Sequence, residues 1–442
     1  MTFILTEFLK DKKDFKYLNL YNNNINSAQS NPSIYIKNDF IYINYRCINY
    51  ISYISHNEKY KKNINGWIAQ NGNVISENYV SCIKNDKVLS KSYKKVNIPE
   101  TDVFSYYKGL EDGILINWDD IFYLCGTRCD IINEKGIFCI YELDRNFNVV
   151  RELILNDDRF NNIEKHWSPI EGMPFTFIRW CNPTEIIKID KNTGDVISVD
   201  TKNKYTDEDF RGNCQTVKYK DGYLSIVHNV SRKINSNLHT IPIYNHYFIK
   251  YDNDFNIVSI SKPFSFETND IEFCCGLQID DENIYVSYSV YDTNPVVIKF
   301  NENTLQEIFN LSEENRIIKQ VDDIYIKGNN FLRQKYFYGA AACYSRVFSN
   351  TADKQLELDS LIKFCTCLLV IKNKGINLFS DDVLLSFLEE ILLIDNNVGE
   401  PYYMLSIYYG LIKNYKKKEI FKRQSINYRF KFPEVKNYLK IW

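Results

Sequence analysis

The chain has 442 residues, of which 45% are hydrophobic, 15% aromatic and 25% charged. This composition is typical of a globular protein with two or three domains, and it argues against intrinsic disorder. The 54 Lys and Arg residues nearly balance the 56 Asp and Glu residues, which gives a formal net charge of −2. Because no basic excess is present, we expect no nucleic-acid binding and no attachment to an anionic membrane surface.

The sequence contains no signal for export or membrane insertion. Met1–Lys10 lacks the basic region, the apolar core and the small-residue cleavage site of a signal peptide. The most apolar candidate for a membrane span, Val383–Ile394, is short and contains Glu389 and Glu390. The 12 cysteines are sparse for a disulfide scaffold of this length. We therefore expect a cytoplasmic protein with free thiols and no membrane span.

Residues 1–311 carry the pattern of an all-β domain. Short runs rich in Ile, Val, Tyr and Phe alternate polar and apolar residues, as in Ser33–Tyr45 and Gly136–Leu143. Turn-forming residues separate these runs. Units of similar make-up recur near residues 32–95, 105–155, 163–203, 209–262 and 270–310. Units of this size predict a five-bladed β-propeller, and a β-sandwich is the alternative.

Residues 312–442 have helical periodicity instead. Apolar residues at i, i+3, i+4 and i+7 predict helices over Glu313–Leu332, Tyr338–Ser349, Asp353–Asn373, Asp381–Ile394 and Glu400–Lys413. The stretch from Gly328 to Tyr344 resembles a tetratricopeptide repeat, in which small residues such as Ala340 and Ala341 let paired helices approach closely. A plain helical bundle is the alternative. This tail is a candidate docking site for a protein partner.

The first candidate for chemistry is a pair of adjacent carboxyl groups. Glu111 and Asp112 come just before the apolar run Ile114–Trp118. In an enclosed, like-charged site one acid of such a pair has a raised pKa, which suits a general acid. The alternative is a solvated turn. Glu272 and Asp292 are further catalytic candidates, since each also lies beside an apolar run.

Further side chains are candidates for substrate binding. Lys165 suits an anion or a sugar hydroxyl, and Trp167 either stacks on a pyranose ring or fills the core. Arg211 offers a planar fork of donors for phosphate or carboxylate. His228, at the end of a strand, is either a proton shuttle or a structural residue.

Two arginines lie inside β-type runs, where a buried charge needs a partner. Arg46 is flanked by tyrosines that include Tyr50, and Arg128 follows the run Phe122–Gly126. A polar central cavity would accommodate both guanidinium groups. We therefore add Arg46, Tyr50 and Arg128 to the binding candidates.

Several kinds of site have no signature in the sequence. A P-loop, a dinucleotide fingerprint, an HExxH motif and a nucleophile elbow are all absent. Cys274 and Cys275 are adjacent, and no second pair has ligand spacing, so we expect them to be buried small hydrophobic residues. Only five histidines are present. We expect neither a metal site nor a cofactor.

The motifs, taken in order, resemble a known group of proteins. They are NYRxxNY, GLEDG, EKxWSP, RGN…LSIVH and IEFCCG…SYSVYD, beginning at Asn44, Gly109, Glu164, Arg211 and Ile271. This series is similar to the five-bladed propellers of glycoside hydrolase family 130, the β-mannoside phosphorylases. It is also similar to glycosyltransferase family 108, the β-mannosyltransferases. The resemblance covers about residues 30–310.

The resemblance implies a carbohydrate-active enzyme that forms or cleaves a glycosidic bond, of the glycosyltransferase or inverting phosphorylase type and acting on mannosides. Its substrates would be a glycan and a sugar phosphate or nucleotide sugar. Asp112 matches the family's proton donor, but Gly113-Ile114 stands where the family has Pro-Arg.

The other residues and the alternatives follow from the same resemblance. Arg128, Lys165, Arg211 and His228 would form a cationic lining for phosphate. One alternative is an inverting hydrolase that pairs Asp112 with another carboxylate, either Glu272 or Asp292. The other is a propeller that has lost catalysis and only binds glycan.

Overall fold

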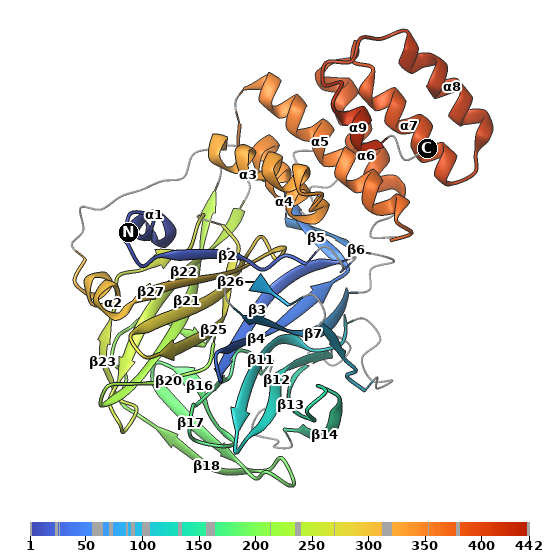
Figure 1. Cartoon of the computed structure of the whole chain (residues 1–442). Coiled ribbons are helices and arrows are strands. Elements are labelled where there is room, and N and C mark those ends of the chain that lie inside the picture. The colour runs from blue at the N-terminus through green and yellow to red at the C-terminus, as the bar shows by residue number, and fades with distance from the viewer. Residues whose placement is uncertain are drawn as a thin grey trace.

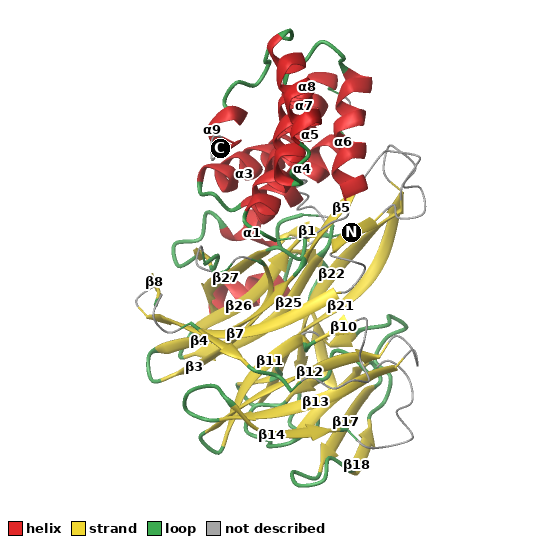
Figure 2. Cartoon of the chain, turned by 90° about the vertical axis from the view of Figure 1, so that its right-hand side faces the viewer, coloured by secondary structure: helices red, strands yellow, loops and turns green. Residues whose placement is uncertain are grey.

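Strands make up most of the chain up to Asn301, and helices make up most of the rest (Figure 1, Figure 2). The fold comes from a computed structural model. It describes residues 2–22, 25, 27–54, 65–69, 74–84, 87–89, 93–99, 107–130, 135–155, 164–212, 214–234, 240–268, 270–311, 321–351, 353–376 and 381–439. The C-terminal helices gather at one end of the sheet body, as both views show.

Two sheets form from the first part of the chain. The first has the order β10-β7-β4-β3 with β8 and β9 beside β7, from the strands β3 (Ala28–Lys37), β4 (Phe40–Ile48), β7 (Val74–Lys84), β8 (Lys87–Val88), β9 (Lys94–Val96) and β10 (Tyr107–Lys108). The second contains, in order, β11 (Glu111–Trp118), β12 (Ile121–Asp130), β13 (Lys135–Leu143) and β14 (Val149–Ile154). A separate hairpin pairs β5 (Tyr50–Ile54) with β6 (Asn65–Ala69).

Three more sheets follow in chain order. The third contains β15 (Ser168–Pro169), β16 (Thr176–Cys181), β17 (Thr184–Ile189) and β18 (Val196–Thr201). The fourth contains β1 (Phe3–Ile4), β19 (Arg211–Gly212), β20 (Val217–Tyr219), β21 (Gly222–Ile234), β22 (Thr240–Tyr251), β23 (Ile257–Ile260) and β24 (Phe264–Ser265). The fifth contains β2 (Lys16–Asn19), β25 (Glu272–Asp280), β26 (Asn283–Val290) and β27 (Asn294–Asn301).

Consecutive sheets pack face to face around a ring, and each interface has its own apolar core. Leu115 and Tyr141 lie in a cluster between the first and second sheets, together with Val80. Trp118 and Phe177 belong to the cluster between the second and third sheets. Similar clusters join the third sheet to the fourth, the fourth to the fifth and the fifth back to the first. The fold is therefore β-propeller-like.

The N-terminal segment closes the ring. Strand β2 pairs antiparallel with β27, so that the last sheet contains the beginning and the end of the β region. The fifth sheet also bonds to the first, because Gln278 accepts a hydrogen bond of 3.2 Å from the Ile36 amide. An N-terminal strand thus completes a sheet whose other strands come from the end of the β region, and this pairing joins the two ends of that region.

Turn residues explain two of the hairpins. Asn38 and Asp39 join β3 to β4 with φ values of 51° and 62°, and Asp119 and Asp120 join β11 to β12 with 51° and 64°. Asn and Asp tolerate this left-handed conformation better than other residues with a side chain. Such two-residue turns match the twist of the strands that they connect.

The helices lie at the two ends of the β region and after it. The bounds are α1 (Leu5–Leu9), α2 (Glu302–Phe309), α3 (Val321–Arg333), α4 (Phe337–Asn350), α5 (Lys354–Asn373), α6 (Asp381–Ile394), α7 (Glu400–Leu411), α8 (Tyr415–Ile426) and α9 (Val435–Leu439). Side-chain caps fix the start of α2 and α5, where Asn301 and Asp353 accept hydrogen bonds from backbone amides of the first turn.

The predicted helices from α4 to α7 occur within about two residues of their expected ends. The expected helix Glu313–Leu332 is described only from Val321, since 312–320 lie outside the described residues. The sequence pattern missed α1, α2, α8 and α9. Gly328 lies where an added Cβ would come within 3.0 Å of the Tyr344 ring, and Ala340 and Ala341 are fully buried. Gly328 therefore lies at a close contact between helices, as expected, and Ala340 and Ala341 lie in the buried core.

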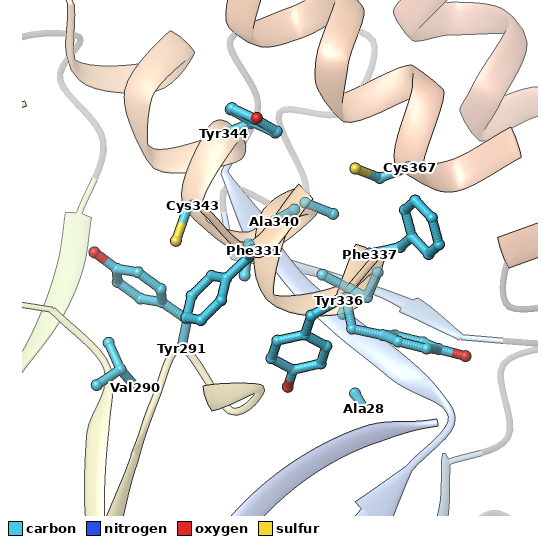
Figure 3. Close-up of a cluster of buried hydrophobic side chains, with 14 of the residues drawn as sticks. Ala28, Val290, Tyr291, Phe331, Tyr336, Phe337, Ala340, Cys343, Tyr344 and Cys367 are labelled. Carbon is cyan, nitrogen blue, oxygen red and sulfur yellow. The ribbon is translucent and has the colours of Figure 1, made fainter. Parts of the chain in front are cut away.

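Helices α3 and α4 pack directly on the sheets. One apolar cluster contains Val290 and Tyr291 of the fifth sheet and Phe331 and Cys343 of these helices (Figure 3). The rings of Tyr21 and Tyr336 stack across the same boundary. This contact is buried and continuous, so the helical part is joined to the sheets by a core and not only by a linker.

None of the helices described is both long and apolar enough to cross a lipid bilayer.

Candidate active site

The carboxylate pair lies at an irregular point of β11. The pairing of β11 with β12 shifts register between Glu111 and Ile114, so that Asp112 and Gly113 form a bulge. Hydrogen bonds hold the bulge, because the carbonyl of Gly113 accepts from Ser33 Oγ at 2.8 Å and from Asn44 Nδ2 at 2.9 Å. Bulges redirect side chains and are common next to active sites. Here the bulge directs neighbouring carboxyl groups to different partners.

Gly113 has a steric reason for its place in the bulge. A Cβ at this position would lie 3.0 Å from Asn78 Oδ1 and 3.0 Å from a methyl group of Leu124. Ile114, the next residue, is buried in the core. The arginine that the resemblance leads one to expect at position 114 therefore has no counterpart there. The guanidinium beside Asp112 comes from Arg46 instead.

Arg46 of β4 joins the two carboxyl groups. Its Nη2 donates to Glu111 Oε1 at 3.0 Å, its Nη1 to Asp112 Oδ1 at 3.1 Å, and its Nε to Ser76 Oγ at 2.9 Å. Arg46 is only 5% exposed, so the expected requirement for a partner is met by two. Such a charge-assisted fork fixes the geometry of both acids.

The remaining partners of the pair come from other elements. Lys165, just before β15, donates to Glu111 Oε2 at 2.8 Å. Asn31 of β3 donates to Asp112 Oδ1 at 2.7 Å. Asp112 Oδ1 therefore accepts two hydrogen bonds, while the side chain stays 17% exposed. Asp112 is thus held in place and still reaches solvent.

Asp292 approaches the same place from the fifth sheet. It lies in the turn between β26 and β27 and is partly exposed. Burial raises its pKa to about 6, the positive charge of Arg46 lowers it, and the negative charge of Asp112 raises it. Because the charges of Arg46 and Asp112 act on its carboxyl group, Asp292 lies near this pair. A carboxyl with this pKa exchanges a proton near neutral pH.

Tyr50 also belongs to this group. It is buried, and burial raises its pKa well above the usual value, while Arg46 lowers it and Asp292 raises it. The ring centre, as we call Arg46, Tyr50, Glu111, Asp112, Lys165 and Asp292, combines strands β4, β5 and β11 with the segments before β15 and after β26.

Several residues of this site have a left-handed backbone conformation. Four residues at the ring centre or touching it have positive φ without being glycine: Asn31 at 41°, Asp112 at 50°, His166 at 65° and Asp292 at 54°. Each such conformation costs about 1–3 kcal/mol when it is strained, and it persists only where the surroundings enforce it. Strain of this kind gathers at sites where side-chain direction matters more than stability.

A second group of side chains borders the ring centre. His166 makes an edge contact with His228 at 5.4 Å between ring centroids, and Tyr244 stacks on His228 at 5.5 Å. Burial lowers the pKa of His166 to about 4; Asp112 raises it, and Lys165 and Arg211 lower it. Burial likewise holds the pKa of His228 well below its usual value. Both imidazoles are therefore neutral at pH 7.

A cavity of about 770 Å³ opens beside this group. Arg211 and Tyr244 line it. The charge of Arg211 acts on His166 of the second group, and the charges of Asp292 and Asp112 of the ring centre act on Tyr244. The remaining lining is mostly polar and comes from Thr2, Glu208, Asp209, Asn229, Val230, Ser231, Arg232, Asn245, Tyr247 and Pro263. The volume is in the range of small-molecule sites.

Glu272 does not belong to the ring centre, contrary to expectation. It is 0% exposed, and its two oxygens accept hydrogen bonds from the backbone amides of residues 266, 267 and 268. Burial and the charge of Glu267 raise its pKa to about 8, while the backbone donors lower it. Glu272 organises a loop and has no access to a substrate.

Three expected binding residues are also placed elsewhere or differently. Trp167 is 1% exposed and stacks on Phe138 in the core, so no face is available to a sugar. Arg128 bonds to Glu152 at 2.8 Å and to the carbonyl of Pro99 at 2.9 Å, on the second sheet and away from the ring centre. His228 reaches the site but is buried and neutral, so it adds no positive charge.

Sequence reasoning missed Asn31, His166 and Tyr244. Asn31 stands before Pro32 inside a β-type run, which is a usable sign of a bulge. His166 lies inside the EKxWSP motif, next to the binding candidate Lys165. Tyr244 had no signal among the 34 tyrosines of the chain.

The described residues include no cluster of three or more His, Cys, Asp or Glu side chains arranged to hold a metal ion. The cysteines described, Cys274 and Cys275 among them, are buried and free.

Comparison with known proteins gives distant structural similarity only. No protein-family model matches the sequence, and no curated protein matches it either. Among solved structures, a β-1,2-mannobiose phosphorylase from Listeria innocua is 8% identical with a TM-score of 0.42, covering 68% of this chain and 95% of that one. A GDP-Man-dependent mannosyltransferase from Leishmania mexicana is 12% identical with a TM-score of 0.39, covering 71% and 96%.

A glycosyl hydrolase from Bacteroides ovatus is similar to the same degree, at 12% identity and a TM-score of 0.42, covering 63% of this chain and 85% of that one. All three TM-scores lie below 0.5. These similarities therefore carry no inference about activity, and the ring centre has to be interpreted from its own residues.

Proposed function

We propose that the chain is a carbohydrate-active enzyme that forms or cleaves a glycosidic bond at the ring centre. One observation carries the proposal: Arg46 of β4, Asp112 of β11, Lys165 before β15 and Asp292 after β26 lie together, and Tyr244, on which both aspartates act, lines a polar cavity of about 770 Å³. The order of the sequence motifs supports the same class. In this proposal the sheets are the blades of a five-bladed propeller, residues 1–311 are its domain, and residues 312–442 form a tetratricopeptide-like domain.

The two aspartates take different roles in the proposal. Asp292, with a pKa of about 6, donates a proton to the glycosidic oxygen as the bond breaks. Asp112 is held as an acceptor by Arg46 and Asn31, so it is placed to receive a proton from an attacking hydroxyl or water. This assignment moves the general acid from Asp112, where the sequence put it, to Asp292.

Phosphate-linked substrates suit the cations of the site. Lys165 is 30% exposed at its side chain, and Arg211 is exposed in the cavity wall. Either can bind the phosphate of a sugar phosphate or nucleotide sugar, or the phosphate that attacks in a phosphorolysis. Mannosides are the substrates that the motif resemblance favours. Arg128 and His228 take no part in this lining.

A glycan-binding protein without catalysis is the second candidate. The observation that favours it is the full engagement of Glu111 by Arg46 and Lys165 and of Asp112 Oδ1 by Arg46 and Asn31. Such a network rigidifies a site. In that case the cavity binds the sugar, and the helices dock a protein partner.

An activity screen with matched variants separates the two candidates. The intact protein is assayed with sugar phosphates, nucleotide sugars and β-mannosides, alongside Asp292→Asn, Asp112→Asn and the control Asp281→Asn. Asp281 is exposed and has φ 53°, so asparagine meets the same backbone demand at all three positions. We expect losses of about 10²–10⁴-fold for the first two variants and full activity for the control. No turnover together with measurable glycan binding would favour the binding protein.

A further inference from the structure

We propose that Arg346 of helix α4 is a positioning residue for Asp292, so that the helical part completes the ring centre. The inference deepens the proposed function, because it rests on the role given to Asp292. It also assigns the helices a task other than partner docking.

The first observation is the contact of Arg346 with the turn that carries Asp292. Arg346 is 1% exposed, and its Nε donates to Asp270 Oδ2 at 3.3 Å. Its guanidinium carbon lies 4.4 Å from the centroid of the Tyr291 ring. Tyr291 directly precedes Asp292, so the guanidinium group covers the turn from the side of the helices. A buried cation over an aromatic face is an attractive contact.

The second observation is the conformation of that turn. Tyr291 and Asp292 have φ values of 59° and 54°, and the amide of Thr293 closes the turn on the carbonyl of Val290 at 3.2 Å. Glycine or asparagine normally occupies such positions, and a tyrosine there is unfavourable. The turn therefore needs support from outside its own hairpin.

Arg346 and Asp270, which lie outside the hairpin, supply this support. The amide of Tyr291 donates to the carbonyl of Ile271 at 2.8 Å, and the amide of Ile271 donates to Asp270 Oδ1 at 2.6 Å. Asp270 in turn pairs with Arg346. Tyr291 is thus held by its backbone through Ile271 and by its ring through Arg346. Figure 3 shows Tyr291 close to Phe331 and to Cys343, which lies on the same helix as Arg346.

Electrostatics agrees with this geometry. Burial raises the pKa of Asp292, and the charge of Arg346 lowers it, as does that of Arg46. Other charged and titratable groups also act on Asp292 or respond to it; they are Glu111 and Asp112 of β11, Tyr50 of β5, Tyr244 of β22 and Cys275 of β25. Within this set, Arg346 is the contribution of the helical part.

The test compares two buried ion pairs that both join the helices to the sheets. Arg346→Gln with Asp270→Asn removes both charges of the first pair. Lys327→Gln with Glu267→Gln removes the pair between α3 and the segment before β25, and neither of these residues is among the groups that act on Asp292. The second double variant is the control for weakened docking. The readout is the titration midpoint of the Asp292 carboxyl by NMR on aspartate-labelled protein, with the signal assigned by its loss in Asp292→Asn.

We expect the Arg346→Gln/Asp270→Asn variant to raise the Asp292 midpoint by about 0.5–1 unit. The control should leave it in place, and Arg346→Lys should retain it. An unchanged midpoint in the Arg346→Gln/Asp270→Asn variant, or equal shifts in both double variants, would overturn the proposal. If the double variant does not fold, Arg346→Gln alone decides, since an unchanged midpoint there contradicts the coupling of Arg346 to Asp292.

The titration is independent of turnover. Should Asp292→Asn retain full activity, the proposed function fails, while the midpoint still reports whether Arg346 acts on Asp292.

Discussion

Two groups of carboxyl side chains in the described part of the chain differ in what their oxygens contact. At the ring centre, Asp112 and Asp292 are partly exposed, and Asp112 bonds to Arg46 and Asn31 of another sheet. At the boundary with the helices, Glu272 bonds to three backbone amides, and Glu267 bonds to Tyr17, Tyr288 and Lys327. The first group can receive a ligand, and the second is saturated by the protein.

Both groups contain an acid with a raised pKa, about 6 for Asp292 and about 8 for Glu272. A raised pKa by itself therefore does not distinguish a catalytic carboxyl from a structural one. Partial exposure and a positive φ distinguish them here. Asp112 and Asp292 have positive φ, whereas Glu272 lies in a regular part of β25.

The largest expected effect on stability comes from the structural group. Above pH 8, where Glu272 is ionised, both of its oxygens accept hydrogen bonds from backbone amides, and Glu272→Gln replaces one of them by an NH2 group that leaves a buried N–H without an acceptor. We expect a loss of about 2–4 kcal/mol in the free energy of unfolding, measured by urea denaturation. Glu282→Gln, at an exposed position, is the control and should change stability by less than about 0.5 kcal/mol. If Glu272→Gln leaves the free energy of unfolding unchanged, the hydrogen bonds of Glu272 are not structural and the two groups do not differ as described.

Replacing an acid of the ring centre should instead raise the free energy of unfolding at high pH. Because the folded pKa of Asp292 lies above its unfolded value, its contribution to stability is complete below about pH 4 and is lost as pH rises through about 6. Asp292→Asn removes this loss. We compare the free energy of unfolding of the variant with that of the native protein at pH 4 and at pH 8. The difference between the two proteins should shift in favour of the variant by about 1–3 kcal/mol between pH 4 and pH 8. Denaturation at both pH values measures this, and an equal difference at the two would contradict the burial of Asp292.

The bulge at Asp112 should show a smaller effect. Gly113→Ala places a Cβ 3.0 Å from Asn78 Oδ1 and from a Leu124 methyl group, so these side chains or the bulge have to move by a few tenths of an ångström. We expect a loss of about 1–2 kcal/mol and weaker catalysis, because Asp112 moves with the backbone. In helix α7, Gly410→Ala meets only the flexible end of Lys418 at 3.4 Å and should stabilise by about 0.5–1 kcal/mol. If both changes have the same sign, the packing at the bulge is not as tight as the structure indicates.

The sequence was most informative where a local pattern has one physical reading. Alternation of apolar residues predicted the strands. The position of Arg46 inside a β-type run predicted a buried partner for its charge, and the structure provides two, Glu111 and Asp112. Adjacent carboxyls identified Asp112, and the Asp after an apolar strand identified Asp292. Each of these signals lies within a few residues of the chain.

Signals that depend on distant contacts could not be predicted in this way. Glu272 and Asp292 look alike in sequence, and only the tertiary packing buries one among backbone amides and leaves the other partly exposed. Trp167 fits a sugar platform equally well until Phe138 covers it. Arg346 lies in the middle of a helix, where an arginine usually faces solvent, and its contact with Tyr291 spans 55 positions of the chain (346 minus 291).

The most direct test of the proposed role of the ring centre is the pH dependence of kcat/KM with the substrate that the screen identifies. If Asp292 is the general acid, kcat/KM should be highest where Asp292 is protonated and fall as pH rises above about 6. Asp292→Asn should abolish this limb together with most of the turnover, while Asp281→Asn should reproduce the native profile. A native profile without a limb near pH 6, or a limb that persists in Asp292→Asn, would show that the proton comes from another residue.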